Sequence, residues 1–437
     1  MTNLIKIAGR NLFRYKRRTL LTLSLIVVGV LFVAGFMAVT GSFKTLMIGQ
    51  VTDSSLGQMQ IHRKGYMGAV ETLPLTMNMK PQAVRKVEAI LKEIPEIDAY
   101  SMRIRFGGMF SNFTETTNIR LSGVDPEMEA RTVPLLLPRV MEGEKALKKG
   151  EILVPELLSR GMKVKVGDIV VVIATNKDGS VNGKQLKVAG ILESATGPGG
   201  RDGYVHIADA MEILRMEETE ITEIALRIMD FQRLHEVFGT LQAKLSGEQN
   251  IQGKPDSQGP KKSGESLSGG PGGPGNQGKG GFEVHTWESL SPFYNIVRMI
   301  DMMTLFIKIM LVAVVLISIM NVMIMAVYER VREIGTIAAI GTLPRKILSM
   351  FLLEGLLLGA IGAVIGGVLS IAMIYAINAA GFTYNFGRQK DIILSAAANP
   401  QDLLVIAGIV ILVAVIASFQ PALKASRMDP IKALGYV

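Results

Sequence analysis

The sequence lacks cysteine altogether and has little charge. Its 437 residues include four histidines and one tryptophan, and only 19% are Asp, Glu, Lys or Arg. The absence of Cys excludes disulfides, thiolate zinc sites and thiol nucleophiles. Soluble domains carry roughly 25% charged residues. The deficit, together with 49% hydrophobic residues and a mean hydropathy of +0.34, argues against a cytosolic enzyme and against a disordered chain. A membrane protein with a soluble part remains.

Four long runs without charge fit that class. A helix needs about 20 apolar residues to cross a hydrocarbon core about 30 Å thick. The runs are Thr19–Phe43, Ile309–Tyr328, Gly355–Gly387 and Leu403–Leu423. The first exceeds the apolar stretch of a signal peptide, and no clear small-x-small cleavage site follows it. We therefore interpret it as a retained membrane anchor.

The positive charge is concentrated in three short segments beside these runs. Residues 1–18, 329–347 and 424–437 together carry 13 basic and 3 acidic residues, whereas the rest of the chain is nearly neutral. By the positive-inside rule, these three segments and both termini are cytoplasmic. The pI of about 9.5 thus reflects membrane orientation, and we expect no nucleic-acid partner.

We predict an α-helical membrane protein with four transmembrane helices and a large α+β extracytoplasmic domain inserted between the first and second spans. The expected segments are a basic cytoplasmic segment 1–18, spans 19–43, 301–328, 348–379 and 402–423, an ectodomain 44–300, a cytoplasmic loop 329–347, a short external loop 380–401 and a cytoplasmic tail 424–437. Lys308 and Glu354, beside or within these spans, are expected to lie near the outer and inner interfaces.

The ectodomain alternates strand and helix patterns. Residues 81–94 begin with Pro and repeat apolar residues at helical spacing. A second helix is expected near 231–245. Short apolar or alternating runs, some preceded by Gly-Asp or Asn-Gly turn signals, predict strands at Gln58–His62, Ile119–Val124, Ile169–Ile173, Leu186–Leu192, Ile224–Ile228 and Phe282–Thr286.

Residues 246–281 differ from the rest of the ectodomain. Twelve of these 36 residues are Gly and four are Pro, so the segment buries too little apolar surface to fold and is expected to be a flexible insertion. Gly273–Gly280 approaches the P-loop pattern but lacks its Ser or Thr, and it does not lie between a strand and a helix. We therefore predict no nucleotide site in this chain.

The loop between the second and third spans contains a short amphipathic helix. In Glu329–Gly341 the apolar residues Val331, Ile334, Ala338 and Ile340 lie near one side. Gly341 is suited to end that helix, and Pro344 to begin the next. An isolated helix this short is marginal in water and needs a surface to dock on. That surface is either the membrane or a groove on a cytoplasmic partner.

These residues carry a family resemblance. Glu329–Gly341 with Arg345–Gly355, and the C-terminal Gln420–Leu434, resemble the permease signature of the MacB, LolC/LolE and FtsX group of ABC transporters. Leu56–Tyr66 and Val284–Glu288 add to the likeness, which covers essentially the whole chain apart from 246–281. It is closest in character to the LolC/LolE lipoprotein-releasing type. MacB carries a fused ATPase domain, which this chain lacks, and the ectodomain of FtsX is much smaller.

The resemblance implies a non-catalytic permease subunit in the bacterial cytoplasmic (inner) membrane. Its partners would be a second permease subunit, in a homo- or heterodimer, and a cytoplasmic ABC ATPase dimer that binds ATP and Mg²⁺, while this chain binds no cofactor. The substrate would be a lipoprotein or another amphipathic envelope molecule, with or without a periplasmic acceptor. The residues expected to bind the ATPase are Arg330, Val331, Arg332, Glu333, Ile334, Gly335, Ile340, Gly341 and Arg345.

Several alternatives stay open at this point. Three functions are compatible with the resemblance. They are lipoprotein release, MacB-like efflux of a peptide or small amphiphile, and an FtsX-like relay that activates an extracellular hydrolase. The loop Ala195–Gly203 is either an ordinary hairpin connection or a substrate-contacting hook of the LolC kind, formed by Thr196, Gly197, Pro198, Gly199, Gly200 and Arg201. Met77 and Met79 have no His or Cys nearby and are interpreted as packing residues, so no metal site is expected. No catalytic residues are assigned.

Overall fold

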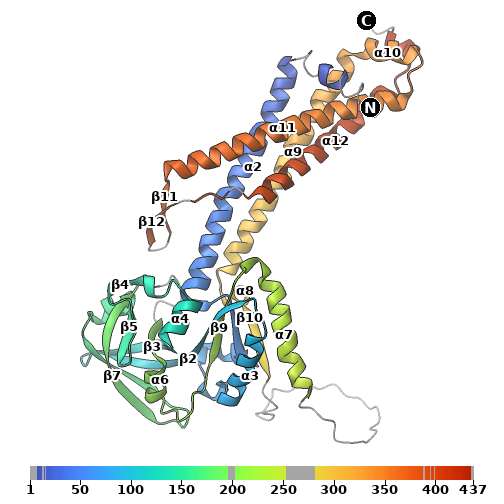
Figure 1. Cartoon of the computed structure of the whole chain (residues 1–437). Helices are drawn as coiled ribbons and strands as arrows, with labels where there is room; N and C mark the ends of the chain where they lie inside the picture. Colours follow the sequence, from blue (N-terminus) through green and yellow to red (C-terminus); the bar gives the residue numbers. More distant parts are fainter. Residues whose placement is uncertain are drawn as a thin grey trace, which may run out of the picture. The chain divides into compact units, whose positions relative to one another are not determined.

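The computed structural model describes residues 7–11, 14, 16–194, 202–251, 281–386, 389–393, 395–397 and 399–434. The chain divides into two compact units, one formed by Met1–Leu46 with Asn295–Val437 and the other by Met47–Tyr294. The first unit is helical and the second is built on a mixed sheet (Figure 1). The predicted fold class, four membrane helices with a large α+β domain between the first and second, is confirmed.

The helical unit contains four helices long and apolar enough to cross a membrane. They are α2 (Lys16–Val51), α9 (Tyr294–Glu329), α11 (Pro344–Ala380) and α12 (Pro400–Ser426). The short helices α10 (Val331–Ala339) and α13 (Pro430–Leu434) follow α9 and α12. A hairpin of β11 (Thr383–Phe386) and β12 (Gln389–Ile393) lies between α11 and α12.

Small residues on α11 allow its neighbours to approach closely. A Cβ on Gly359 would lie 2.6 Å from the Cβ of Ala414 in α12, and one on Gly362 would lie 2.6 Å from Ile26 in α2. Side chains from all four long helices fill the common core, among them Ile26, Leu311, Phe351 and Val410. Packing of this kind, with small residues at the contact, is how membrane helices associate when lipid removes the hydrophobic driving force.

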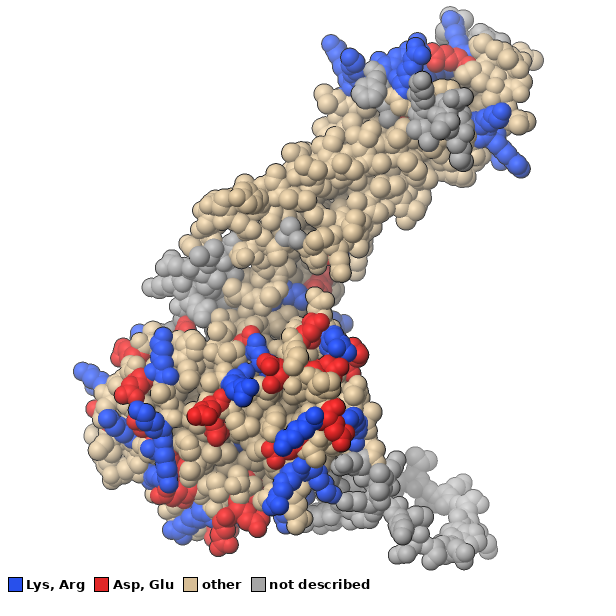
Figure 2. All heavy atoms as spheres, viewed as in Figure 1, with Lys and Arg blue, Asp and Glu red and all other residues tan. Residues whose placement is uncertain are grey.

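Two ion pairs join α2 to α9, one near each end. Lys44 Nζ lies 2.8 Å from both carboxylate oxygens of Asp301, and Arg18 Nη1 donates to Glu329 at 2.8 Å. Between the ends of the unit, the visible face of the helices carries almost no charge, whereas basic side chains gather where α10 lies (Figure 2). The charge distribution of the sequence thus appears on the surface as a charged end and an apolar middle.

The ectodomain unit is a ten-stranded mixed sheet. Its strands are β1 (Met59–Arg63), β2 (Ile97–Ser111), β3 (Thr116–Val124), β4 (Val140–Gly143), β5 (Glu151–Pro155), β6 (Ile169–Thr175), β7 (Val181–Leu192), β8 (Asp202–His206), β9 (Glu223–Ile228) and β10 (Phe282–Thr286). The order is β10-β1-β9-β2-β3-β8-β5-β7-β4, and β6 pairs with both β2 and β7. All pairs are antiparallel except β3–β8 and β5–β7.

These pairings close part of the sheet into a ring. The strands β2, β3, β8, β5, β7 and β6 pair successively, and β6 returns to β2. One edge of the long strand β2 pairs with β9 through Arg103 and then with β6 from Met109 onward. The first half of β2 therefore extends the β10-β1-β9 sheet, and its second half completes a small barrel.

Six α-helices and several short turns accompany these strands in the described part of the ectodomain. They are α3 (Pro81–Lys92), α4 (Pro126–Thr132), α5 (Glu156–Met162), α6 (Ile207–Ile213), α7 (Leu234–Ile251) and α8 (Trp287–Leu290) in the ectodomain, preceded by the C-terminal end of α2, which continues into a π-helical turn, η1 (Thr52–Leu56). Helix α3 buries Val84, Val87, Ile90 and Leu91, the stripe that its sequence spacing predicted. Residues 252–280 of the Gly- and Pro-rich segment lie outside the described residues.

Candidate functional site

Helix α10 is positioned by the residues at its two ends. It starts after Arg330, whose backbone is not helical (φ −112°, ψ 18°), and its last turn closes at Ile340. Gly341 has φ +94°, a left-handed conformation that favours glycine. Leu343 then precedes Pro344, the first residue of α11. The loop therefore folds as the predicted helix, glycine turn and new helix.

One side of α10 is buried by this chain itself. Val331 and Ile334 are 5% and 2% exposed, and Ile334 belongs to the core cluster that contains Ala425 of α12. Helix α13 packs against α10 and buries Ala433. Val331, Ile334 and Gly335, three residues expected to bind an ATPase, are thus buried within this chain and not exposed to a partner in this structure.

Arg330 is also internal. Its guanidinium lies 3.4 Å from both carboxylate oxygens of Glu354 in α11, and Nη2 donates to the carbonyl of Asn11 at 3.4 Å. The side chains of Arg330 and Glu354 are 3% and 1% exposed. A guanidinium committed to a buried carboxylate and a backbone carbonyl is a structural tie between the loop and α11, and it is not presented to a partner.

The other side of α10 and the turn after it are exposed. Ile337, Ile340 and Leu343 are 37%, 80% and 62% exposed. Charged residues surround them: Glu333 accepts from Arg14 at 3.0 Å, and Arg332 and Arg345 are exposed. The part of the predicted site that is open to a partner therefore consists of Arg332, Glu333, Ile340, Gly341 and Arg345, to which the structure adds Ile337 and Leu343.

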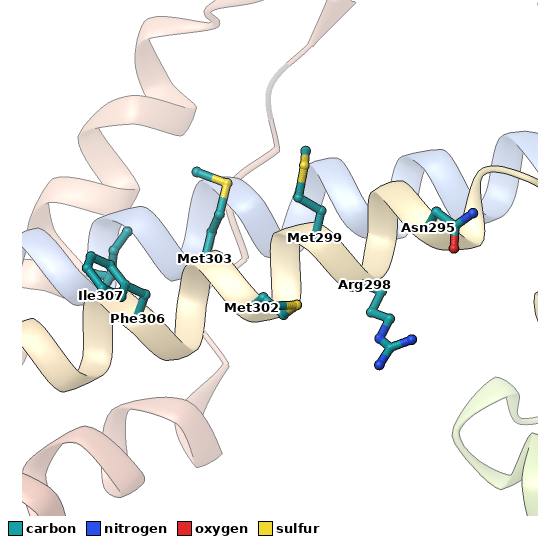
Figure 3. A pocket seen from close by; sticks show the side chains of 7 residues that line it. All are labelled: Asn295, Arg298, Met299, Met302, Met303, Phe306 and Ile307. Atoms are coloured by element: carbon teal, nitrogen blue, oxygen red, sulfur yellow. The ribbon is translucent and has the colours of Figure 1, made fainter.

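A second candidate feature is a groove along the N-terminal part of α9. It has a volume of about 610 Å³ and is lined by Asn295, Arg298, Met299, Met302, Met303, Phe306 and Ile307. Phe306 and Met302 are 70% and 65% exposed. Figure 3 shows Met299 and Met303 side by side, with Arg298 near the start of the helix and Phe306 farther along it. The groove is apolar and adaptable, because methionine side chains are flexible, and it has one cation, Arg298, toward the N-terminal end of the helix.

The predicted hook residues, Thr196 to Arg201, lie outside the described residues. The residues on both sides of them are held firmly. Ser194 Oγ accepts from the amide of Leu157 at 3.0 Å, and the carboxylate of Asp202 accepts from Arg120 Nε at 2.7 Å.

A buried ionic cluster in the ectodomain was not evident in the sequence. Arg103 of β2 pairs with Glu129 of α4 at 2.6 Å and with Glu223 of β9 at 3.0 Å, and all three are buried. Burial alone would raise the pKa of Glu223, but Arg105, Arg103 and the hydrogen bond from His62 outweigh it and hold that pKa well below its usual value. The only sequence signal that could have indicated this cluster was the pair of arginines at alternate positions of β2, Arg103 and Arg105.

Comparison with known proteins follows the same division into two parts. Residues 19–243 match the MacB-like periplasmic core domain, and residues 305–430 match the FtsX-like permease C-terminal domain. The first match alone covers more than half of the chain. The chain belongs to the MacB/FtsX family of permeases.

Curated members of the MacB/FtsX family share short stretches with the chain. The macrolide export ATP-binding/permease protein MacB of Campylobacter fetus is 38% identical over 116 residues, 26% of this chain and 16% of MacB. The ABC transporter permease YtrF of Bacillus subtilis is 37% identical over 123 residues, 27% of this chain and 28% of YtrF. The matched stretches thus span less than a third of these relatives.

Among solved structures, the ectodomain resembles the periplasmic region of MacB from Actinobacillus actinomycetemcomitans. The likeness covers 54% of this chain and 92% of that one, at 12% identity and a TM-score of 0.34.

Proposed function

We propose that this MacB/FtsX-family chain is the permease subunit of an ABC transporter whose ATPase is a separate cytoplasmic subunit that docks on the exposed side of α10. The observation that supports the proposal is the position of Ile340, which follows α10 directly and is 80% exposed at the basic end of the helical unit, with Ile337 and Leu343 also exposed, whereas the opposite side of α10 is packed against its own chain. Large apolar residues in such a place are typical of a protein contact.

In this proposal the ATPase subunits bind ATP and Mg²⁺, and this chain binds neither. Two permease subunits pair in the inner membrane with both termini in the cytoplasm. Closure of the ATPases on ATP moves α10, and the long helices transmit that movement to the ectodomain. The permease itself performs no chemistry.

The docking experiment compares three substitutions of isoleucine by aspartate. Ile340→Asp places an unpaired carboxylate in the proposed contact, which costs about 1–3 kcal/mol and weakens ATPase association roughly 5- to 150-fold. Ile431→Asp is the matched control, because Ile431 is 82% exposed on α13. Ile334→Asp changes the buried side of α10 and is expected to lower the amount of folded permease instead.

The measurement is the amount of ATPase that copurifies from membranes at matched permease levels. We expect a loss with Ile340→Asp and normal recovery with Ile431→Asp. Equal recovery and equal ATPase stimulation for wild type and Ile340→Asp would remove α10 as the docking helix, and would favour its resting on the membrane surface.

The substrate we propose is a lipidated or otherwise amphipathic envelope molecule, as in lipoprotein release. The support is the methionine-lined groove of α9, which offers flexible apolar surface for acyl chains with Arg298 at the end suited to an anionic group. A photo-crosslinker replacing Met303 is expected to capture an acylated substrate, whereas one replacing Val368, 62% exposed on α11, is expected to capture only bulk lipid.

Two results would redirect this proposal. Equal capture of the acylated substrate at both positions would exclude the groove as its site. Capture of an unacylated peptide as strongly as the acylated one would favour MacB-like export of peptides or small amphiphiles.

A further inference from the structure

The segment that follows α2 is held to the ectodomain by specific hydrogen bonds and an ion pair. Helix α2 continues into the π-turn η1, and Gly57 (φ +77°) then turns the chain into β1, its amide donating to the carbonyl of Thr52 at 2.9 Å. The last carbonyls of a helix have no partner within it and must find one elsewhere. Here the carbonyls of Asp53 and Ser54 find partners in the segment before β4.

Residues from both halves of the sheet hold the turn. On one side, Arg227 of β9 forms a 2.9 Å ion pair with the carboxylate of Asp53. On the other, the carbonyl of Asp53 accepts from the amide of Leu135 at 2.8 Å, and the carbonyl of Ser54 accepts from Arg139 Nη1 at 2.8 Å. The turn is thus tied to the β10-β1-β9 sheet through the side chain of Asp53, and to the segment before β4 through the backbone carbonyls of Asp53 and Ser54.

Arg139 continues the connection into the barrel. Its Nη2 donates to the carbonyl of Glu193 at 2.6 Å, and its own carbonyl accepts from the amide of Glu193 at 2.9 Å. Val133 and Leu136, just before Arg139, pack in the barrel core with Leu192. The guanidinium of Arg139 therefore joins Ser54, in the turn after α2, to Glu193, the residue that follows β7.

We propose that Arg139 is the positioning residue that transmits movement of α2 from Ser54 to Glu193 and so to the β7 end of the barrel. The inference rests on the proposed function, because ATP-driven movement of α2 is part of it. Arginine suits this role because its rigid, planar fork donates to two carbonyls in different directions, whereas the single nitrogen of lysine cannot reproduce that geometry.

The first test uses the full-length permease alone and needs no ATPase. Hydrogen exchange is followed at the amides of residues 191–194 in four proteins: wild type, Arg139→Met, Asp53→Asn and the double variant. Asp53→Asn removes the ion pair with Arg227 and loosens the turn from the opposite side. We expect exchange about fivefold faster in either single variant, the loss expected for one hydrogen bond, and no further increase in the double variant.

The matched control is Arg131→Met, which removes the same charge from an exposed site on the neighbouring helix α4. It should leave exchange at residues 191–194 unchanged. If Asp53→Asn does not alter exchange there, or alters it equally with and without Arg139, the connection through Arg139 is overturned.

The second test follows the movement itself. Since the chain has no Cys, a single Glu193→Cys carries a spin label, and the spectrum of the permease–ATPase complex is compared without nucleotide and with ATP plus vanadate. We expect the spectrum to change in the otherwise wild-type and Arg131→Met proteins and to stay unchanged in Arg139→Met, although all three copurify ATPase that hydrolyses ATP.

The outcomes separate the two proposals. An Arg139→Met protein whose label responds as the parent's does would overturn the role of Arg139, as would a parent label that does not respond in a complex that hydrolyses ATP. If no ATPase copurifies with any of them, the proposed function fails, and the hydrogen-exchange result alone decides whether Arg139 links Ser54 to Glu193.

Discussion

Arg330 and Glu354 form a buried ion pair that fixes the start of α10 to the interior of α11. Nη1 of the guanidinium lies 3.4 Å from each carboxylate oxygen, and neither side chain is more than 3% exposed. Arg330, one of the residues that the sequence suggested for contact with an ATPase, is therefore part of the internal structure of the helical unit. A docked partner would act on this pair only through the helix that begins beside it.

Removal of one member of this pair is expected to destabilise the permease by about 3–5 kcal/mol, because the remaining charge is left buried without its oppositely charged partner. The variants are Arg330→Met and Glu354→Gln, measured by thermal unfolding in detergent. Arg345→Met, at an exposed position, should have little effect. The double variant Arg330→Met/Glu354→Leu should recover most of the loss, and no recovery would show that the pair is not the source of the stability.

The close approach of α11 and α12 predicts opposite effects of one substitution at two glycines. Gly359→Ala would place a Cβ 2.6 Å from that of Ala414, which cannot move without its backbone, and should cost about 1–3 kcal/mol. Gly367→Ala has nothing within 4 Å of its Cβ and should be neutral or stabilising, since alanine favours the helix. Thermal midpoints of the two purified variants provide the comparison.

The ectodomain is expected to lose stability as the pH falls toward 6. Burial lowers the pKa of His285, and the neighbouring His62 adds to this effect, against a smaller opposing influence of Glu283. The unfolded chain, with the ordinary pKa of about 6.5, then binds a proton more readily than the folded domain. This contribution to stability is present above pH 6.5 and is lost as the pH falls through that value toward the folded-state pKa.

Trp287 reports this transition, because it is the one tryptophan of the chain and is 3% exposed in the ectodomain. Its emission wavelength during denaturant unfolding should give a smaller unfolding free energy at pH 5.5 than at pH 7.5. His285→Gln should reduce this difference, and an identical pH dependence in the variant would exclude His285 as its origin.

The membrane orientation is testable with reporter fusions. A reporter after residue 437 or within 330–341 should be cytoplasmic, because the positive-inside rule predicts that face for the basic segments. One within residues 252–280 should be external, and deletion of most of that segment should leave assembly intact. An external C-terminus would contradict the four-span arrangement, and failed assembly of the deletion would show that the segment is structural.

Local patterns predicted many elements but not their long-range partners. The spacing in α3 is visible in the sequence because that helix buries one apolar face. The alternation in β1 is visible too, although the strand is buried on both faces. The long strand β2 was not predicted, since its arginines and paired glycines break the alternation. Arg103 is buried only because Glu129 and Glu223 come from distant segments.

The same limit applies to the docking helix. Its position and ends followed from Gly341 and Pro344, but the sequence could not show which side its own chain would cover. That side is set by α13, about 90 residues later in the sequence, and the separation left Ile334 and Ile340 looking equivalent. In the structure one is 2% and the other 80% exposed.

The two ion pairs between α2 and α9 also have a consequence for the bilayer. About 26 residues separate Arg18 from Lys44, or about 39 Å of helix, and the partner residues on α9 are spaced slightly farther apart. Helices fastened together at both ends cannot slide past one another to suit a different hydrocarbon thickness, so they must tilt as a pair. Reconstitution in lipids of graded acyl-chain length should therefore reveal a preferred bilayer thickness for this permease.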